Sequence, residues 1–423
     1  MSETRSSLED VIKSKPEDWE ERRLGDLFKQ RKEKNRPDLP LLAVTGAGGV
    51  VPRDSLERRD TSNADKSKYL RVCEGDIAYN TMRMWQGVSG LSAHEGIVSP
   101  AYTICQPVNG VSSGYMSQLF KLPELIQVFH RNSQGLVDDT LNLKFENFSP
   151  IRIPVPPLPE QQKIAAILSS VDDVIEKTRA QIDKLKGLKT GMMQELLTKG
   201  IGHTAFKDSP VGRIPEGWDV VYISDVCTHI VDCVNKTAPV VDYVTPFKMI
   251  RTTNVRDGRI LTEGMRYVTQ ETFQSWSRRL SLRKGDLIFT REAPVGECGL
   301  VDNAEGLFLG QRTMVYRADP QKLDNRFLLF SLLSEYCQSQ IEDLSGGSTT
   351  PHLRVPDCSK IIIKVPPMEE QKEISSAIHS VFDSIDTKER KVTQLIAVKK
   401  ALMQDLLTGK VRVNVDNKEN AVA

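Results

Sequence analysis

The chain has 423 residues, which is too long for one ordinary domain and predicts two to four compact units. Hydrophobic residues make up 39% of the chain and charged residues 27%, as in water-soluble globular proteins. No apolar run reaches the roughly 20 residues that a membrane-spanning helix needs, and the first residues lack the apolar core of a secretion signal. These features argue against a membrane protein, and we expect a cytoplasmic one.

The net charge and the cysteines exclude further classes of protein. The formal net charge of +1 does not fit a uniformly basic nucleic-acid binder, although it leaves local basic patches open. The chain has seven cysteines, an odd number, with no CxxC pair and no histidine at ligand spacing. We therefore expect reduced thiols and no metal site.

After a tail over residues 1–15, residues 16–155 predict a mixed α/β domain. A short strand pattern, Ile77 to Tyr79, begins after a turn at Gly75-Asp76. Basic residues outnumber acidic ones between residues 22 and 36, although such a run is more often a solvated surface than a DNA contact. Further arginines follow, and on charge alone they are candidate DNA contacts. They are Arg53, Arg58, Arg59 and Arg83, of which we favour Arg53 and Arg83.

A long helix is predicted next, over residues 156–200. Prolines from Pro154 to Pro159 hold the chain extended, and the segment that follows contains no proline. Glu160 lies near the predicted helix start, where the helix dipole favours an acidic side chain. Apolar residues then recur in alternating steps of four and three, which is the spacing of a coiled-coil seam. The seam positions are Ile164, Leu168, Val171, Ile175, Ile182 and Leu185.

Beyond a linker over residues 201–214, the chain repeats itself. Asp76 and Asp286 are 210 positions apart, and the same offset superimposes Glu160 on Glu370 without a gap. Upstream the offset shrinks, because Trp19 corresponds to Trp218 and the second half carries extra residues. Two copies are too few for a solenoid, so the repeat predicts a pseudo-twofold molecule.

The second α/β domain, residues 215–365, carries a basic stretch. Residues 246–291 contain ten lysines or arginines against four acidic residues, with aromatic side chains between them. Such a surface can contact phosphates and base edges, and arginine can bind guanine through two hydrogen bonds. Composition alone fits a solvated surface over core aromatics equally well. Our candidate DNA contacts here are Lys248, Arg251, Arg256, Arg259, Arg278, Arg279 and Arg291.

A second long helix is predicted over residues 366–410, before a tail over residues 411–423. The interruptions of the two seams correspond, since Thr178 and Lys189 fall on Lys388 and Lys399. Matching seams and breaks predict that the two helices pack on each other, antiparallel, as a rod of about 57 Å for roughly 38 residues. The alternative is that each helix is buried against its own domain. The second seam consists of Ile374, Ile378, Val381, Ile385, Val392 and Leu395.

The sequence lacks the common catalytic motifs. It contains no GxxxxGK[ST] phosphate loop, no GxSxG elbow, no HExxH zinc site and no base-deaminase signature. The glycine-rich segment Gly46–Gly49 has no lysine or dinucleotide fingerprint at the required spacing and predicts a turn. The chain also lacks an Asn-Pro-Pro-aromatic segment, by which amino-methylating enzymes grip adenine or cytosine.

One arrangement resembles the magnesium site of many nucleases. Asp357 is followed by Glu370-Gln371-Lys372, an acidic residue plus an ExK pattern. The first half has Glu160-Gln161-Gln162 at the equivalent position, without the lysine, and Glu370 lies at the start of a predicted helix. We therefore discount the nuclease reading and expect no catalytic residue and no cofactor in this chain.

The two long helices and the segments before them resemble the conserved regions of Type I restriction-modification specificity subunits. The similarity covers nearly the whole chain, and the duplicated combination is highly specific. The segments Ile214 to Trp218 and Lys284 to Ile288 also look like hallmarks of this family. The conserved regions run from Pro156-Pro157-Leu158-Pro159-Glu160-Gln161-Gln162-Lys163-Ile164 to Met193-Gln194-Glu195-Leu196-Leu197-Thr198, and from Val365-Pro366-Pro367-Met368-Glu369-Glu370-Gln371 to Leu406-Leu407-Thr408-Gly409-Lys410.

The resemblance implies a non-catalytic subunit of a bacterial defence complex. Each α/β domain would be a target recognition domain that reads one half of a bipartite, asymmetric sequence in double-stranded DNA. The paired helices would set the spacer between the halves and dock two methylation subunits, and restriction subunits would join a larger complex. S-adenosylmethionine, ATP and magnesium would bind in those partners. Recognition domains diverge too strongly for any base-contacting residue to be carried over by motif.

Two other classes of protein compete with this interpretation. A recognition module fused to its own nuclease or methylase would need a catalytic domain, and the tails over residues 1–15 and 411–423 leave no room for one. A structural coiled-coil adaptor would need no such domain. It would show no sequence preference even when its partners are present.

Overall fold

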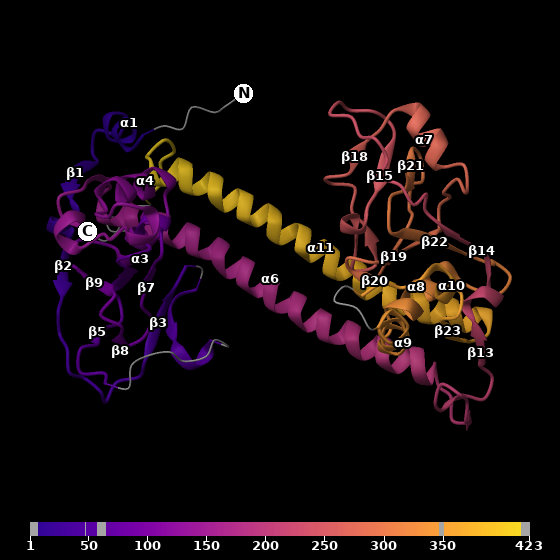
Figure 1. The fold of residues 1–423 in the computed structure, drawn as a ribbon. Helices are drawn as coiled ribbons and strands as arrows, with labels where there is room; N and C mark the ends of the chain where they lie inside the picture. The colour runs from indigo at the N-terminus through magenta and orange to yellow at the C-terminus, as the bar shows by residue number, and fades with distance from the viewer. Residues whose placement is uncertain (1–6, 47, 57–64, 347–350, 416–423) are drawn as a thin grey trace, which may run out of the picture. The chain divides into compact units, whose positions relative to one another are not determined.

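The computed structural model describes residues 7–46, 48–56, 65–346 and 351–415, and it divides into two compact units. The first unit comprises the described residues up to Arg179 together with those from Arg390 onward, and the second comprises Ala180–Glu389. Both units are mixed α/β, as expected from the sequence. The two long helices each begin in one unit and end in the other (Figure 1).

The first unit is built on a four-stranded antiparallel sheet with the strand order β2-β9-β6-β7. Gly75, with a φ of +84°, makes the turn that leads into β6, and Asp76 follows it. Three two-stranded antiparallel ladders complete the strands: β1 with β10, β3 with β4, and β5 with β8. The strands are β1 (Glu20–Arg23), β2 (Phe28–Arg31), β3 (Leu42–Thr45), β4 (Gly49–Pro52), β5 (Leu70–Val72), β6 (Ile77–Asn80), β7 (Ser89–Leu91), β8 (Gly96–Val98), β9 (Tyr102–Pro107) and β10 (Arg152–Val155).

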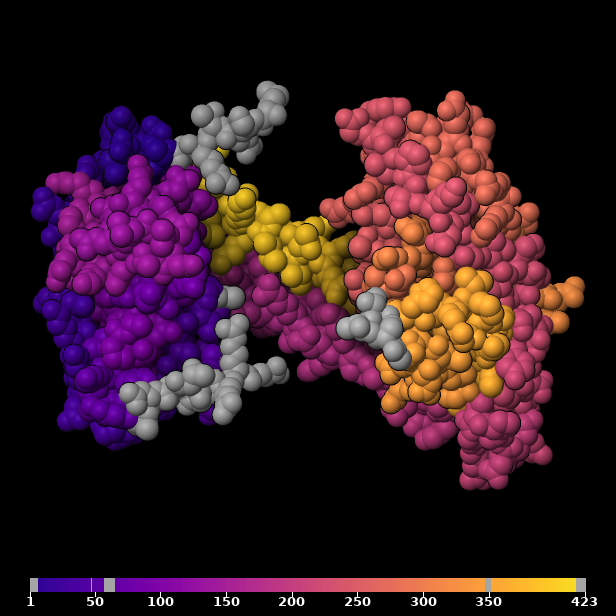
Figure 2. Space-filling view, viewed as in Figure 1, coloured from indigo at the N-terminus to yellow at the C-terminus, as the bar shows by residue number. Residues whose placement is uncertain are grey.

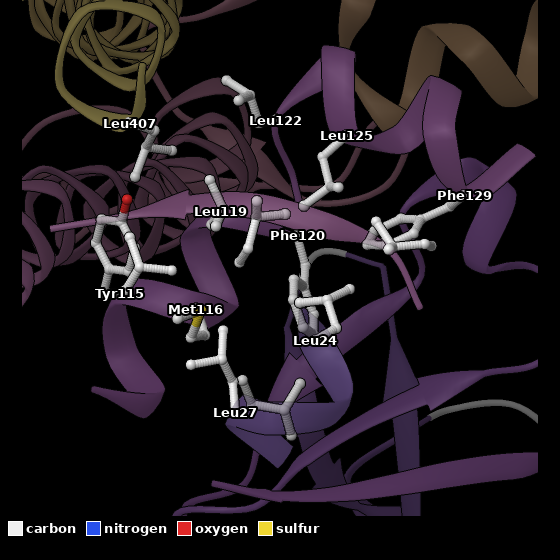
Figure 3. Close-up of a cluster of buried hydrophobic side chains, with 14 of the residues drawn as sticks. Leu24, Leu27, Tyr115, Met116, Leu119, Phe120, Leu122, Leu125, Phe129 and Leu407 are labelled. Carbon is white, nitrogen blue, oxygen red and sulfur yellow. The ribbon is translucent and has the colours of Figure 1, made fainter. Parts of the chain in front are cut away.

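Short helices cover this sheet and form the core of the unit. Figure 3 shows Tyr115, Leu119 and Leu122 close to Leu407, so the end of the last long helix is part of the same core. The tail that we expected over residues 1–15 contains a helix, whose Leu8 side chain is buried in this core. The helices are α1 (Leu8–Lys13), α2 (Leu24–Leu27), η1 (Arg53–Ser55), η2 (Met84–Gln86), α3 (Ser113–Leu119), α4 (Pro123–Asn132), η3 (Asp138–Thr140) and α5 (Phe145–Phe148).

The second unit has a four-stranded antiparallel sheet of matching order, β14-β22-β19-β20. The turn before β19 again uses a glycine with positive φ, Gly285 at +88°. A separate sheet, β18-β15-β21, contains the parallel pair β15 with β21, where the first unit has isolated parallel bridges, Leu41 with Ile97 and Val50 with Ser92. The strands are β11 (Phe206–Lys207), β12 (Ile214–Pro215), β13 (Asp219–Tyr222), β14 (Cys227–Asp232), β15 (Lys248–Ile250), β16 (Val255–Arg256), β17 (Arg259–Ile260), β18 (Arg266–Tyr267), β19 (Leu287–Arg291), β20 (Val295–Leu300), β21 (Leu307–Leu309), β22 (Thr313–Ala318) and β23 (Ile362–Val365).

The helices of the second unit lie mainly toward the end where the long helix α11 begins (Figure 1). Helix α7 lies at the other end, beside β15, β18 and β21. In the space-filling view, α8 and α9 (orange) form one face of the unit (Figure 2). The helices are η4 (Ile223–Asp225), η5 (Thr252–Asn254), α7 (Gln270–Trp276), α8 (Asn325–Leu333), α9 (Glu335–Ser345) and α10 (Val355–Cys358).

The two long helices are α6 (Leu158–Lys199) and α11 (Met368–Leu407). Within the second unit they run antiparallel, because Gln181 meets Lys388 while Lys189, two turns further along α6, meets Phe382. Within the first unit, Lys399 Nζ lies 2.7 Å from a carboxylate oxygen of Asp172. Helix pairing was expected from the repeat, and both helices begin within two residues of their predicted starts.

The predicted seam residues are all buried or half-buried. Those nearest the helix starts, such as Ile164 and Ile374, belong to the hydrophobic cores of their own units. Ile175 and Ile182, further along α6, are also buried. The seam residues near each helix start are therefore buried by their own domain. We attribute the burial of the residues in the middle of each seam to the partner helix.

All seven cysteines are free. Burial raises the pKa of Cys227, Cys337 and Cys358 to about 12, so these thiols stay protonated near neutral pH. Among the described residues, no group of three or more potential ligands can hold a metal ion. The described helices also include none with the length and hydropathy to cross a membrane.

Candidate nucleic-acid interface

A buried carboxylate ties the start of each long helix to its own domain. In the first unit, the Trp19 indole N–H donates to Glu160 at 3.1 Å. In the second unit, the Trp218 indole N–H donates to Glu370 at 3.0 Å. Both tryptophans are almost completely buried, so the glutamate satisfies a donor that would otherwise lack a partner. The Trp-Glu pair is therefore a structural feature of the repeat.

The glutamine that follows each glutamate also forms hydrogen bonds within its own domain. Gln161 Oε1 accepts the backbone N–H of Ser112 at 2.9 Å, and its amide donates to the Pro156 carbonyl. Gln371 Oε1 accepts the N–H of Asp324 at 2.8 Å, and its amide donates to the Pro366 carbonyl. Each glutamine thus joins the extended proline segment to the N-cap residue of a short helix, Ser112 of α3 or Asp324 of α8, so the Pro-Glu-Gln motif has a structural role.

The residues that resembled a nuclease site do not converge on a metal. Asp357 is paired with Lys360 and Arg354, and hydrogen bonds from these two side chains lower its pKa. Glu370 accepts from Trp218 and also lies 2.7 Å from His203 Nε2. Each carboxylate is occupied by separate partners, which supports discounting this arrangement.

The basic stretch of the second unit runs from β15 to β19. Its β15, β18 and α7 lie at the end away from α9 (Figure 1), whereas Arg259 on β17 contacts Asp386 of α11. Arg278 is exposed and has no hydrogen bond or ion pair with the described residues. Arg279 is exposed too, although its guanidinium donates to the Cys233 carbonyl at 2.9 Å. Arg266, which we had not selected, is exposed on β18 without a described partner. All three arginine side chains are therefore accessible to a ligand.

Three other selected residues are partly engaged. The Lys248 ammonium lies 5.8 Å from the centre of the Tyr267 ring. Arg251 donates to the Gly264 carbonyl at 3.3 Å, and Arg256 is 3.5 Å from Glu297. These contacts leave donors on each guanidinium for phosphate, so the residues remain candidates.

Two selected arginines have structural roles instead. Arg291 is only 5% exposed, forms a 2.9 Å ion pair with Asp232 and donates to the Leu353 carbonyl. Arg259 is half-buried and binds Asp386 of α11 at 2.6 Å. A count of charges cannot distinguish such buried pairs from surface cations, and neither residue is retained as a DNA contact.

In the first unit the basic surface is weaker. Arg83 is exposed just after β6, and its only described partner is Gln86 at 3.5 Å. Arg53 is half-buried in η1. Within the basic run, Arg31 forms a bidentate pair with Asp76, which removes it from the surface. Arg58 and Arg59 lie outside the described residues.

The sequence and fold of the chain are similar to those of known proteins. A model of the Type I restriction modification DNA specificity domain matches residues 124–186 and 215–397. The MjaVIII Type I restriction enzyme specificity subunit of Methanocaldococcus jannaschii is 31% identical over 414 residues, covering 94% of each chain. The MjaX subunit of the same organism, described as putative in function, is 27% identical over 94% of this chain and 95% of its own.

Solved structures share the fold. The S subunit of a Type I restriction-modification system from M. genitalium aligns with a TM-score of 0.57 at 11% identity, covering 92% of this chain and 96% of its own. A chain solved in a study of Type I system assembly and conformational transition aligns with a TM-score of 0.51 at 16% identity. With the family model and the M. jannaschii relative, these findings show that the chain belongs to the family of Type I restriction-modification DNA specificity subunits.

Proposed function

We propose that each unit reads one half of a bipartite, asymmetric DNA target and that α6 and α11 set the spacer between the halves. One observation carries this proposal. The units share the sheet order β2-β9-β6-β7 and β14-β22-β19-β20. They differ in the segment between the first sheet strand and the Gly-Asp turn, which contains β3 to β5 in the first unit and β15 to β18 in the second; we call this segment the insertion. A common frame with divergent insertions is what two readers of different half-sites require.

The charge distribution supports duplex DNA as the ligand of the divergent region. Arg266, Arg278 and Arg279 are exposed on the insertion of the second unit. Phosphate contacts of this kind position a protein on the duplex, whereas contacts to base edges provide sequence discrimination. We therefore assign these arginines to the backbone of DNA and expect the second unit to make the stronger phosphate contacts.

We also propose that the long helices dock two methylation subunits. Leu188 on α6 and Val398 on α11 occupy equivalent positions of the repeat and are each 50% exposed. Beside the end of α6, a groove of about 800 Å³ is lined by Met193, Leu197 and Tyr336, among others. Apolar side chains held in water on a rigid helix favour burial by a partner. Equivalent sites on the two helices fit two copies of one partner.

The chemistry in this proposal belongs to the partner subunits. Methylation of adenine, ATP-driven translocation and DNA cleavage would take place there, and restriction subunits would join through the methylation subunits. This division of labour rests on the family and on the roles found for the acidic residues, which are held in structural pairs.

Adenine methylation across the genome tests the proposal. Cells that express this chain with its neighbouring methylase are compared with cells that lack this chain alone. We expect a two-part motif with a fixed gap that disappears when the chain is absent. A motif that persists without the chain would place sequence choice elsewhere and favour a structural adaptor.

A further inference from the structure

The second unit presents an ordered apolar tip at residues 240–244, within its divergent insertion. Among these residues, Val240, Tyr243 and Val244 are 44%, 58% and 79% exposed. Single exposed apolar side chains are common on protein surfaces and need no explanation. Three within five residues of one segment form a concentrated apolar surface. Such surfaces mark sites where another molecule binds.

Hydrogen bonds hold both sides of this tip against the strand β18. On one side, the Val241 N–H donates to the Tyr267 carbonyl at 2.9 Å. On the other, the Thr245 hydroxyl donates to the Val268 carbonyl at 2.8 Å. Only three residues, Asp242 to Val244, lie between the two anchors. A short segment pinned at both ends loses little conformational entropy when it binds, so its side chains are prepared for contact.

A small hydrophobic cluster lies next to the tip in the sequence but does not include the tip residues. Ala238, before the tip, is 3% exposed and packs with Met249 and Phe308 in a small hydrophobic cluster. Tyr243 and Val244 do not belong to this cluster, and both are exposed. Replacing them with polar residues is therefore expected to leave the cluster intact.

The charges around the tip indicate a polyanion. Arg266 lies on the strand that anchors the tip, and Lys248 pairs with Tyr267 on the neighbouring strand. Lys236 precedes the tip and is exposed. The acidic side chain in the tip itself is Asp242. An apolar projection with cations on its own segment and on the strands β15 and β18 fits the major groove, where cations meet the phosphates and the projection meets base edges.

We propose that Asp242, Tyr243 and Val244 form the base-reading element of the second unit. Valine methyl groups can pack against the C5-methyl group of thymine, and a carboxylate can accept a hydrogen bond from the amino group of cytosine. The tyrosine supplies a rigid ring and a hydroxyl for further contact. This inference rests on the proposed function, because it names the residues by which one recognition domain would choose its bases.

The test uses the reconstituted complex of the full chain with its methylation subunits and a pool of duplex DNA of random sequence. Tyr243→Ala, Val244→Thr and Asp242→Asn are compared with the wild type. Val244→Thr keeps the shape of the side chain but replaces a methyl group with a hydroxyl. The matched control is Val355→Thr, a 40% exposed valine of α10 in the same unit. Thermal unfolding checks that each variant is folded.

We expect each tip variant to lower discrimination at one or two positions in one half of the target by about tenfold, with the other half unchanged. The control should match the wild type. An unaltered motif in all three tip variants overturns the inference. Loss of a methylation subunit with an unaltered motif also overturns it, and would make the tip a protein interface. If the wild type itself selects no motif, the proposed function fails first and the inference falls with it.

Discussion

The carboxylates at the starts of the two long helices have the same role but different side-chain partners. In the first unit, Glu160 is bound by Arg412, whose guanidinium also forms two hydrogen bonds to Asp18. In the second unit, Glu370 lies against His203 and accepts the backbone N–H of Ile201. Arg412 and His203 each belong to the few residues that follow the end of the other long helix. The difference shows that the repeat preserves a position for a donor and not a particular residue.

The same distinction applies to the contact between the helices. In the first unit Lys399 forms an ion pair with Asp172, whereas in the second its equivalent, Lys189, lies 4.6 Å from the centre of the Phe382 ring. An aromatic ring can attract a cation as a carboxylate does. The shared frame should therefore respond alike to matched mutations, while the divergent parts should not.

Removal of the buried tryptophans tests the shared frame with the largest effect. Trp19→Ala and Trp218→Ala should each lower the free energy of unfolding by about 3–5 kcal/mol, because each leaves a cavity and a carboxylate without its donor. Urea unfolding followed by circular dichroism measures the loss. Tyr222→Ala, at a 51% exposed position, is the control and should change stability by less than about 0.5 kcal/mol. A large effect in one unit alone would contradict equivalent frames.

The glutamines provide a second matched pair. Gln161→Leu and Gln371→Leu remove the partner of one backbone N–H and one proline carbonyl each. We expect each change to cost about 1–3 kcal/mol, the usual penalty for buried unsatisfied groups. Gln162→Leu, at an exposed neighbouring position, is the control for the change in side chain. If Gln371→Leu were as stable as the wild type, the hydrogen bonds of this glutamine would not stabilise the fold.

Charge reversal of surface arginines compares the contributions of the two units to DNA binding. In the reconstituted complex, Arg278→Glu with Arg279→Glu should weaken DNA binding about tenfold and lower the slope of log K against log salt by about 2. Arg83→Glu in the first unit should lower the slope by about 1. Lys207→Glu, on the β11–β12 hairpin, is the control. Unchanged DNA affinity in the double variant rules out this choice of phosphate contacts.

Lys121 should make the stability of the first unit depend on pH in a way that has no equivalent in the second unit. Its ammonium donates to the carbonyls of Gly87 and Ser89, and burial lowers its pKa to about 8, whereas the offset of 210 residues places the uncharged Ser331 at this position in the second unit. The unfolded chain therefore binds more protons than the folded one between about pH 8 and the usual lysine pKa of about 10.4. Stability should rise with pH across this window, by at most about 1.4 kcal/mol per pH unit. The slope should be smaller in Lys121→Leu, as measured by urea unfolding at pH 8, 9 and 10; an identical slope would argue against this assignment.

Most of the frame could be predicted from the sequence, because its signals are local. Proline clusters and the spacing of apolar residues indicated both long helices, and the offset of 210 residues indicated the second copy. Helix α1 was missed, although Ser7 and Asp10 form a capping box that is visible as a serine three residues before an acid. The Trp-Glu pairs join residues about 140 or more positions apart. The one signal in the sequence was that both copies of the repeat contain the tryptophan and the glutamate.

The candidate interface was predicted less well, for a physical reason. Arg278 and Arg291 carry the same charge, but Arg291 is buried against Asp232, which lies 59 positions earlier in the chain. Whether a cation pairs with an acid or faces solvent depends on tertiary contacts that composition does not contain. The apolar tip was overlooked because Val240 and Val244 are typical of a core and only the structure shows their exposure.

The composition of the first unit has a consequence for synthesis on the ribosome. Leu406 and Leu407 complete the core that also contains Leu8 and Tyr115, whereas the second unit ends at Glu389. The unit whose residues are translated first is therefore the last to have all its parts. Until α11 emerges, the core residues that receive Leu407 lack their cover (Figure 3). A ribosome that stalls after residue 389 would release a chain with a finished second unit and an open first one, a natural substrate for chaperones and proteases.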